Sequence, residues 1–282
     1  MVHYIAQPAI SQQIAALEQE FGAKLFERTS RNVQLTPAGK VFYEEVKVIL
    51  DRLESAIIKT VNTAKGATGS ITIGFQGLHE MEILPQLITN FRFSNPGIEV
   101  QISQNLVLQL EKNLRDGLAD VVFTLPFYSE SGADINVLPV IKSRWCVVLN
   151  AMHPLAGRKS IQRSELCNEK YICIDPKLDP CVIESMINTC MNNGFLPQIV
   201  AHTKNFEEIF LMIEAGLGIW FFPKCCNRDN SNLRFIELEG EDEAIDIVLL
   251  WNKNNENTAI PLFVKEVESL NSCIRDSKLK PI

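Results

Sequence analysis

The stretch from Thr36 to Ala64 constrains the fold most, because it predicts a single long helix. Thr36 is a good N-cap, Pro37 loses no hydrogen bond at the first helical position, and Gly66 is a plausible stop. Between them an apolar stripe recurs at steps of three or four residues: Phe42, Val46, Ile49, Leu53, Ile57 and Val61. About 29 residues give a rod of roughly 43 Å. One small domain cannot cover such a rod, so we expect a partner helix, most simply the same helix of a second copy, although a long core helix is the alternative.

Composition narrows the class of protein. The 282 residues suffice for two or three compact units, and no apolar run is long enough to span a membrane. The start, MVHYIAQPAISQQ, does not resemble a secretory signal, and the eight cysteines show no paired CxxC spacing of a metal site. We therefore expect a cytoplasmic protein with reduced thiols. The net charge of −7 argues against a protein that coats nucleic acid, but the first 40 residues are slightly basic and permit DNA contact there.

The first 40 residues follow the pattern of a winged helix. A helix is expected over residues 7–21, and its apolar face consists of Ile10, Ile14, Leu17 and Phe21. Ser11, Gln12 and Gln13 lie off this face near the helix start, where short polar side chains and amides suit phosphate and base-edge contacts. After Gly22, a basic turn over residues 28–32 separates two short apolar segments, which indicates a two-stranded wing.

The segment QPAISQQIAALEQEFGAKLFERTSRNVQLTPAGKVF closely resembles the DNA-binding head of LysR-type transcriptional regulators, almost continuously over residues 7–42. The resemblance implies that residues 7–21 form the recognition helix of a winged helix-turn-helix. It places four residues near the major groove: Gln7, Pro8, Ser11 and Gln12. It also places Arg28 and Arg31 on the wing, against phosphates or the minor groove, with a solvated charged turn as the alternative.

The resemblance departs from the family at its start. The family head begins about two helices earlier, whereas only MVHYIA precedes Gln7 here. The missing helices would cover the apolar face of the recognition helix. We favour a true start further upstream or a trimmed chain, because the recognition helix and the wing look undamaged. The alternative is an oligomerising effector-binding protein that has lost DNA binding through truncation.

The remaining chain alternates strands with helices, which is typical of βαβ units and a mostly parallel sheet. We expect strands over residues 69–75, 98–103, 119–125, 144–150, 171–175 and 245–251, and the run GLGIWFFP leads into a further strand. We expect helices over residues 83–93, 106–118, 181–193, 205–215 and 260–274. The fold class is therefore α/β.

The resemblance continues through this body in GSITIGF, ILPQLITNFRFSNPGIEV, LRDGLADVVF, HPLAGRKSIQRSEL and IEAGLGIWFFP. It implies two Rossmann-like subdomains joined by crossing strands, similar to periplasmic solute-binding proteins, with a small effector in the cleft. The expected organisation has four parts: a partial winged helix-turn-helix over 1–40, a linker and dimerisation helix over 36–65, effector subdomain 1 over 69–143 and 252–282, and effector subdomain 2 over 144–251.

Ligands of open α/β sheets bind beyond the carboxyl ends of the strands. This rule predicts a set of effector-binding residues: Gln76, Gly77, Leu78, Asn105, Thr124, Leu125, Asp175, Asn205 and Phe222. For Gln76, Thr124 and Asn205 a structural turn or cap is the alternative, and Asp175 precedes a proline, which favours a turn. Asn105 is followed by leucine and valine where the family often has small polar residues, so we expect an apolar or aromatic effector.

No catalytic or cofactor motif emerges. The four histidines are scattered, and there is no HExxH, GxGxxG or GxxxxGK[ST]. We expect no enzyme, no cofactor and no metal site. Cys181 and Cys190 resemble the pair of the family's peroxide-sensing branch, but nine residues of intact helix span about 13.5 Å, too far for a disulfide. Redox sensing is therefore a minor alternative, and the adjacent Cys225 and Cys226 are expected to pack near a loop.

The leading hypothesis is a LysR-type regulator of transcription. It predicts a homodimer or homotetramer that binds promoter DNA and responds to a small effector.

Overall fold

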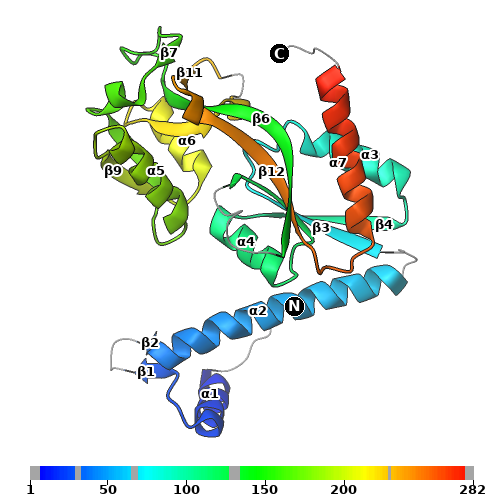
Figure 1. The fold of residues 1–282 in the computed structure, drawn as a ribbon. Helices are drawn as coiled ribbons and strands as arrows, with labels where there is room; N and C mark the ends of the chain where they lie inside the picture. Colours follow the sequence, from blue (N-terminus) through cyan, green and yellow to red (C-terminus); the bar gives the residue numbers. More distant parts are fainter. Residues whose placement is uncertain (1–6, 29–32, 65–68, 127–133, 228–229, 277–282) are drawn as a thin grey trace. The chain divides into compact units, whose positions relative to one another are not determined.

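The computed structural model describes residues 7–28, 33–64, 69–126, 134–227 and 230–276. The chain divides into two compact units, residues 1–60 and residues 61–282, and each is described by itself. Figure 1 shows the elements in chain order. None of the helices within the described ranges combines the length and the apolarity that a membrane crossing requires.

The first unit contains the predicted helix, the two-stranded wing and all but the last residues of the long helix (Figure 1). Their bounds are α1 (Gln7–Phe21), β1 (Phe26–Arg28), β2 (Val33–Leu35) and α2 (Pro37–Ala64). The two strands pair antiparallel, with Phe26 opposite Leu35. The predicted N-cap is confirmed, since the Thr36 hydroxyl accepts a hydrogen bond from the Gly39 N–H at 2.9 Å and donates one to the Lys24 carbonyl at 2.6 Å.

The start of α2 packs against the wing and α1. A Cβ at Gly39 would lie 2.0 Å from the Leu25 carbonyl oxygen, so only glycine allows this close approach. The Phe21 and Phe42 rings meet edge to face with centroids 4.7 Å apart. Further along the predicted stripe, Ile49, Leu53 and Ile57 are each more than half exposed, and the side chain of Val61 lies outside the described residues.

The second unit consists of two halves, and we call the one that begins with β3 the first half (Figure 1). Its elements are β3 (Gly69–Phe75), α3 (Leu84–Ser94), β4 (Ile98–Gln104), α4 (Val107–Arg115), β5 (Val121–Thr124) and α7 (Ala259–Asp276). β3 lies between β4 and β5 and pairs parallel with both. The apolar faces of α3 and α7 meet over this sheet, where Phe91 and Phe263 pack edge to face at 5.3 Å.

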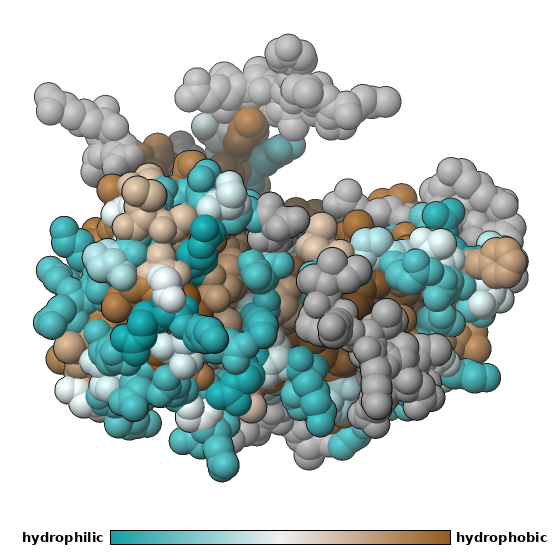
Figure 2. Space-filling model, turned by 90° about the horizontal axis from the view of Figure 1, so that it is seen from above, coloured by the Kyte–Doolittle hydropathy of each residue, from teal (hydrophilic) through white to brown (hydrophobic). Residues whose placement is uncertain are grey.

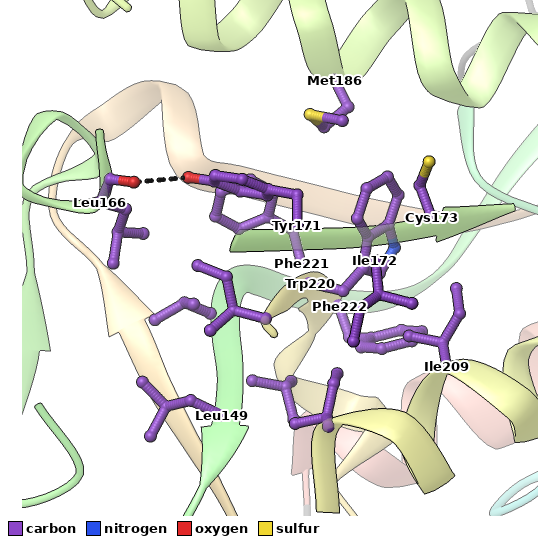
Figure 3. Close-up of a cluster of buried hydrophobic side chains, with 14 of the residues drawn as sticks. Leu149, Leu166, Tyr171, Ile172, Cys173, Met186, Ile209, Trp220, Phe221 and Phe222 are labelled. Atoms are coloured by element: carbon purple, nitrogen blue, oxygen red, sulfur yellow. Dashed lines mark hydrogen bonds between the residues drawn. The ribbon is translucent and has the colours of Figure 1, made fainter. Parts of the chain in front are cut away.

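The second half has its own α/β core. Its elements are β7 (Ser160–Ile161), β8 (Lys170–Ile174), α5 (Pro180–Asn192), β9 (Gln198–Thr203), α6 (Phe206–Glu214), β10 (Trp220–Pro223) and β11 (Leu233–Leu238). β8 and β9 pair parallel. Figure 3 shows the core, in which the buried Tyr171 hydroxyl donates a hydrogen bond to the Leu166 carbonyl at 3.0 Å.

Two long strands join the halves: β6 (Ile135–Asn150) and β12 (Ala244–Asn252). They pair antiparallel from Ala244 opposite Arg144 to Asn252 opposite Ile135. β5 continues the sheet on the β12 side, and β10 and β11 continue it antiparallel on the β6 side. The crossing strands predicted by the family resemblance are therefore present.

The expectation of a mostly parallel sheet was wrong at the centre of the molecule. The larger sheet is mixed, because β6 and β12 run antiparallel to their neighbours while β3, β4 and β5 are parallel among themselves. β6 also begins at Ile135 rather than at residue 144. Its first part was missed because Pro139 argues against a strand and because the residues before Arg144 are mostly only half-buried, so they form no continuous apolar run. β7, β9 and β11 were not predicted.

Candidate effector-binding site

A cavity lies where the two halves meet beside the crossing strands. Its empty volume, including the open mouth, is about 730 Å³. The first half contributes Gln76, Leu78, His79 and Leu125, all at or after the carboxyl ends of β3 and β5. The cavity thus occupies the position expected for a ligand of an open α/β sheet.

The second half supplies an aromatic wall. Phe206 at the start of α6 and the β10 residues Trp220, Phe221 and Phe222 line the cavity, and Trp145 of β6 joins them. The Phe206 and Phe222 rings pack edge to face at 5.9 Å. Figure 3 shows the β10 side chains of Trp220, Phe221 and Phe222 in the buried cluster, together with Met186 of α5. Such a wall suits an apolar or aromatic ligand.

Figure 2 shows the body from above, coloured by hydropathy. Hydrophilic side chains make up most of the outer surface on this face, and hydrophobic residues show between them in the hollowed parts.

Gln76 carries a polar atom that lacks a hydrogen-bond partner at the cavity. The residue is 4% exposed, and its side-chain Oε1 is buried without a hydrogen bond among the described residues. An unsatisfied buried amide oxygen costs free energy, which a ligand N–H or O–H group would recover. Gln76 therefore favours a ligand that carries a hydrogen-bond donor.

The backbone after β3 is already occupied by an internal carboxylate. Glu80 is fully buried and accepts the backbone N–H groups of Gln76, Gly77 and Leu78 at 3.3, 3.2 and 3.2 Å. His79 Nε2 lies 3.0 Å from Glu80 Oε1. Burial acts to raise the pKa of Glu80, but the charge of His79 and these hydrogen bonds outweigh it, so the pKa lies below its usual value. Because Glu80 takes these donors, this loop does not offer them to an anionic ligand.

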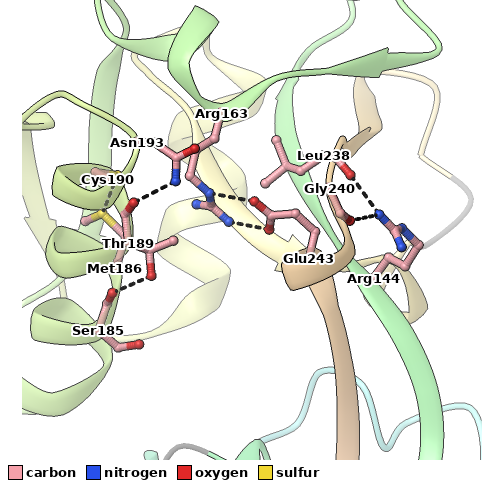
Figure 4. Close-up of polar contacts among 10 residues, drawn as sticks. All are labelled: Arg144, Arg163, Ser185, Met186, Thr189, Cys190, Asn193, Leu238, Gly240 and Glu243. Carbon is pink, nitrogen blue, oxygen red and sulfur yellow. Dashed lines mark hydrogen bonds and ion pairs between the residues drawn. The ribbon is translucent and has the colours of Figure 1, made fainter.

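The cation of the cavity is likewise paired. Arg163 Nε and Nη2 donate to Glu243 Oε1 and Oε2 at 2.9 and 2.6 Å, and both side chains are more than nine-tenths buried (Figure 4). The guanidinium carbon of Arg163 also lies 4.2 Å from the centroid of the Phe221 ring. A bidentate pair of this kind leaves no net charge to attract an ionic ligand.

Four of the predicted effector residues line the cavity: Gln76, Leu78, Leu125 and Phe222. The other five are placed elsewhere. Gly77 adopts a φ of +94°, and a Cβ there would lie 2.3 Å from Gln104 Nε2. Asn105 donates to Ser103 Oγ at 2.7 Å, and Thr124 is buried in β5 opposite Val248.

The remaining two of these five hold local turns. Asp175 accepts the Lys177 N–H at 2.9 Å, and Asn205 is the N-cap of α6, where it accepts the Glu208 N–H at 2.9 Å. These contacts correspond to the alternatives given for the two residues, a turn for Asp175 and a helix cap for Asn205. Apart from Phe222, the aromatic wall was not predicted, and neither were Arg163 and the α5 residues. The run WFFP at residues 220–223 is an aromatic signal that could have indicated the rest of the β10 part of the wall.

Five of the six predicted DNA-contact residues belong to α1 or β1 of the first unit. Ser11 and Gln12 are on the early turns of α1, where Ser11 is half-buried and Gln12 is exposed. Gln7 and Pro8 begin α1 and Arg28 ends β1, while their side chains lie outside the described part. Arg31 falls entirely outside the described residues.

The predicted redox pair is separated by an intact helix. Cys181 and Cys190 both lie on α5, nine residues and therefore roughly 13.5 Å apart along its axis. Cys190 is fully buried, and burial raises the pKa of its thiol to about 11. A buried, protonated thiol at this distance does not make a peroxide-sensing pair with Cys181.

Comparison with known proteins agrees with this architecture. Residues 64–270 match the family described as LysR substrate binding domain, and residues 2–40 match the one described as bacterial regulatory helix-turn-helix protein, lysR family. The transcriptional regulator AlsR of Bacillus subtilis is 28% identical over 262 residues, which cover 92% of this chain and 86% of AlsR.

Solved structures share the fold. Full-length CbnR in complex with its target DNA superposes with a TM-score of 0.69 at 20% identity, covering 94% of this chain and 91% of CbnR. Full-length BenM gives a TM-score of 0.60 at 25% identity, covering 98% of this chain and 91% of BenM.

A winged helix, a long helix and a two-part α/β body with a cavity at its centre define a DNA-binding regulator that responds to a small molecule. The chain belongs to the LysR family of transcriptional regulators, and its body is the effector-binding domain of that family. Its relatives are regulators rather than enzymes.

Proposed function

We propose that this regulator responds to an uncharged, mainly apolar or aromatic small molecule that carries at least one hydrogen-bond donor. The observation that carries the proposal is the pairing of the buried charged groups at the cavity, Arg163 with Glu243 and His79 with Glu80, beside the unpartnered Gln76 oxygen. The exposed Asp242, which also lines the cavity, further disfavours an anionic ligand. The aromatic wall supplies apolar contact, and Gln76 accepts the donor of the ligand.

Tryptophan fluorescence tests this proposal, because Trp145 and Trp220 line the cavity. Replacing Trp251 by Phe removes the third tryptophan, which lies in the core of the first half. We expect 2-naphthol to change the emission and to bind at least tenfold more tightly than 2-naphthoate. Tighter binding of the anion would overturn the proposal. The cavity-filling variant Ser185→Phe should abolish binding, whereas Ser164→Phe on an exposed turn should not.

The effector acts on transcription through DNA, and we propose that α1 reads the promoter through Ser11 and Gln12 while Arg28 and Arg31 contact the backbone. The exposed position of Gln12 near the start of α1 supports this arrangement. In gel shifts with DNA from upstream of its gene, Gln12→Ala should lower specific binding at least tenfold with little change in the salt dependence. Arg28→Ala should instead reduce the salt slope. Absence of specific binding by the unaltered chain would favour the effector-binding alternative.

We further propose that the regulator works in the cytoplasm as a homodimer or homotetramer held by paired α2 helices. The stripe of Ile49, Leu53 and Ile57 supports this, since each is more than half exposed and needs a partner. Two paired recognition helices could then reach successive major grooves about 34 Å apart. Leu53→Glu should yield monomers in light scattering, whereas Lys47→Glu on the same helix should leave the assembly unchanged.

A further inference from the structure

A thiol pair lies directly behind the cavity wall. Cys225 and Cys226 follow β10 in a short 3-10 turn, Lys224–Cys226. Cys226 is 2% exposed, and its Sγ lies 3.7 Å from Nδ1 of His79, whose other ring nitrogen faces Glu80. Cys225 is partly exposed, and its N–H donates to Ser143 Oγ at 3.2 Å. The cavity residue His79 thus connects the two cysteines to the loop that Glu80 holds.

Cys225 differs electrostatically from the buried thiols of the body. A hydrogen bond from the Cys226 thiol has the largest effect on the pKa of Cys225 and lowers it. Burial raises this pKa, whereas the Ser143 hydroxyl and the charge of His79 lower it further. Together these influences lower the pKa of Cys225 to about 7. Burial instead raises the thiol pKa of Cys146 and Cys173 to about 12.

Charged groups from several elements lie near Cys146, on which Cys225 also acts. Glu80 opposes ionisation of Cys225. The neighbouring groups Arg144 of β6, Lys224 of the turn and Glu237 of β11 form a linked set, in which Arg144 Nε lies 3.9 Å from Glu237 and Lys224 Nζ contacts the same carboxylate. Because the two cations share one anion, this set does not oppose a thiolate at Cys225.

The surroundings of Cys225 are otherwise apolar. It packs against a cluster that includes Leu125, Ile245 and Ile247, together with Trp145. Leu125 and Trp145 also line the cavity. A molecule suited to the cavity therefore meets compatible side chains at the thiol as well.

The adjacency of the two cysteines argues against a disulfide. Consecutive Cα atoms are about 3.8 Å apart, whereas disulfides span about 4.4–6.8 Å. A carbon electrophile needs only one thiolate and imposes no such strain.

We propose that Cys225 is a covalent modification site for small apolar electrophiles of the conjugated-carbonyl class, such as enones and quinones. The Cys225 sulfur uses a lone pair to form an S–C bond at the β-carbon. The C=C π electrons move toward the carbonyl oxygen, and the resulting enolate takes a proton from water. The proton lost by the thiol has gone to solvent, so the addition is balanced and requires no oxidant.

Modification reaches the cavity through contacts already present. An adduct on Cys225 disturbs the hydrogen bond from Cys226, and Cys226 contacts His79. His79 and Glu80 hold the loop that carries Gln76. Control of transcription by this route rests on the proposed function, whereas the chemistry of the thiol does not.

Substoichiometric N-ethylmaleimide tests the site on the full chain, with peptide mass mapping of all eight cysteines. At pH 7 Cys225 should be labelled at least fivefold faster than the exposed Cys167, and its rate should rise with pH around a midpoint near 7. Ser143→Ala should move this midpoint upward, and unfolding in urea should remove the difference in rate. Labelling of Cys225 no faster than that of Cys167 overturns the proposal.

The same sample separates this inference from the proposed function. The Cys225 adduct should also alter the tryptophan emission, and Cys225→Ser should abolish that change while Cys167→Ser keeps it. An adduct that leaves the emission unchanged would overturn the link to the cavity. Failure of the unlabelled chain to bind 2-naphthol would overturn the proposed effector class and leave the labelling result standing.

Discussion

The carboxylate of Asp179 accepts the backbone N–H of Val107 at 3.0 Å, and this bond ties α5 of the second half to α4 of the first. Asp179 is fully buried, and Val107 is the first residue of α4. One turn further, the pKa of Glu111 is raised, mainly by burial and further by the negative charge of Asp179, against the opposing effect of Arg115. The carboxylate of Asp179, from the opposite half, therefore caps the N-terminus of α4.

Removing this tie should destabilise the body. In Asp179→Ala the Val107 N–H stays buried without its acceptor, and we expect a loss of about 1–3 kcal/mol in the free energy of unfolding. Asp175→Ala is the matched control, because that carboxylate accepts the Lys177 N–H in a partly exposed turn and should cost about 0.5 kcal/mol or less. Urea unfolding followed by tryptophan fluorescence measures both. Equal losses would contradict a special role for Asp179.

The Arg163–Glu243 pair should behave as a buried ion pair. Arg163→Met leaves the Glu243 carboxylate buried and unpaired, and we expect a loss of about 3–5 kcal/mol. The double variant Arg163→Met with Glu243→Leu should recover part of this loss, since neither charge remains. Arg158→Met breaks an exposed pair with Glu165 and should cost about 1 kcal/mol or less. A small effect of Arg163→Met alone would show that water reaches the pair.

Gln76 should distinguish ligands by their donor. Gln76→Leu removes the acceptor, so 2-naphthol should lose about 0.5–1.5 kcal/mol of binding free energy, or up to roughly tenfold in affinity. Naphthalene has no donor, and its affinity should stay constant or improve. Fluorescence titrations of both ligands give the comparison. An equal loss for both would mean that the substitution acts through the shape of the cavity.

Glu18 should make the first unit sensitive to acid. Its carboxylate accepts the N–H groups of Leu25 and Phe26 at 2.9 and 3.1 Å and pairs with Lys24 at 2.8 Å. The hydrogen bond from Lys24, followed by those two backbone bonds, lowers the pKa of Glu18 to about 2. The folded pKa is lower than the unfolded one, so the stabilisation is complete above about pH 4.5 and is lost as the pH falls toward 2.

Hydrogen exchange at the Leu25 and Phe26 amides, corrected for the intrinsic rate, should reveal this loss. Protection should be high at pH 6 and should fall below pH 4. Glu18→Gln should show low protection at both values, whereas Glu20→Gln on the exposed side of α1 should behave like the original chain. Protection of these amides that is independent of pH in the original chain would contradict the assignment.

The sequence predicts those parts of the molecule whose patterns are local. The cap at Thr36, the helix α2 and the alternation of β3 with α3 were confirmed, because each depends on neighbouring residues. The rule for carboxyl strand ends placed Gln76 and Leu125 at the cavity.

Features that depend on distant pairing were not predictable. The ion pair of Arg163 joins residues 80 positions apart, and the tie of Val107 to Asp179 spans 72. Asn205 and Asp175 follow the same rule as Gln76, but their side chains bond to their own turns, which a pattern of residue types cannot distinguish from ligand contact.

The ribbon of β6 and β12 limits how the two halves can rearrange. Both strands run through both halves, and their pairing shifts register between Ile247 and Val248, where Val140 is the extra residue of β6. Rotation of one half must twist this ribbon, and the bulge is the place where its hydrogen bonds can yield with the least loss. We therefore expect the two halves to switch between a few discrete relative orientations by twisting at that bulge. A continuous opening in any direction is not expected.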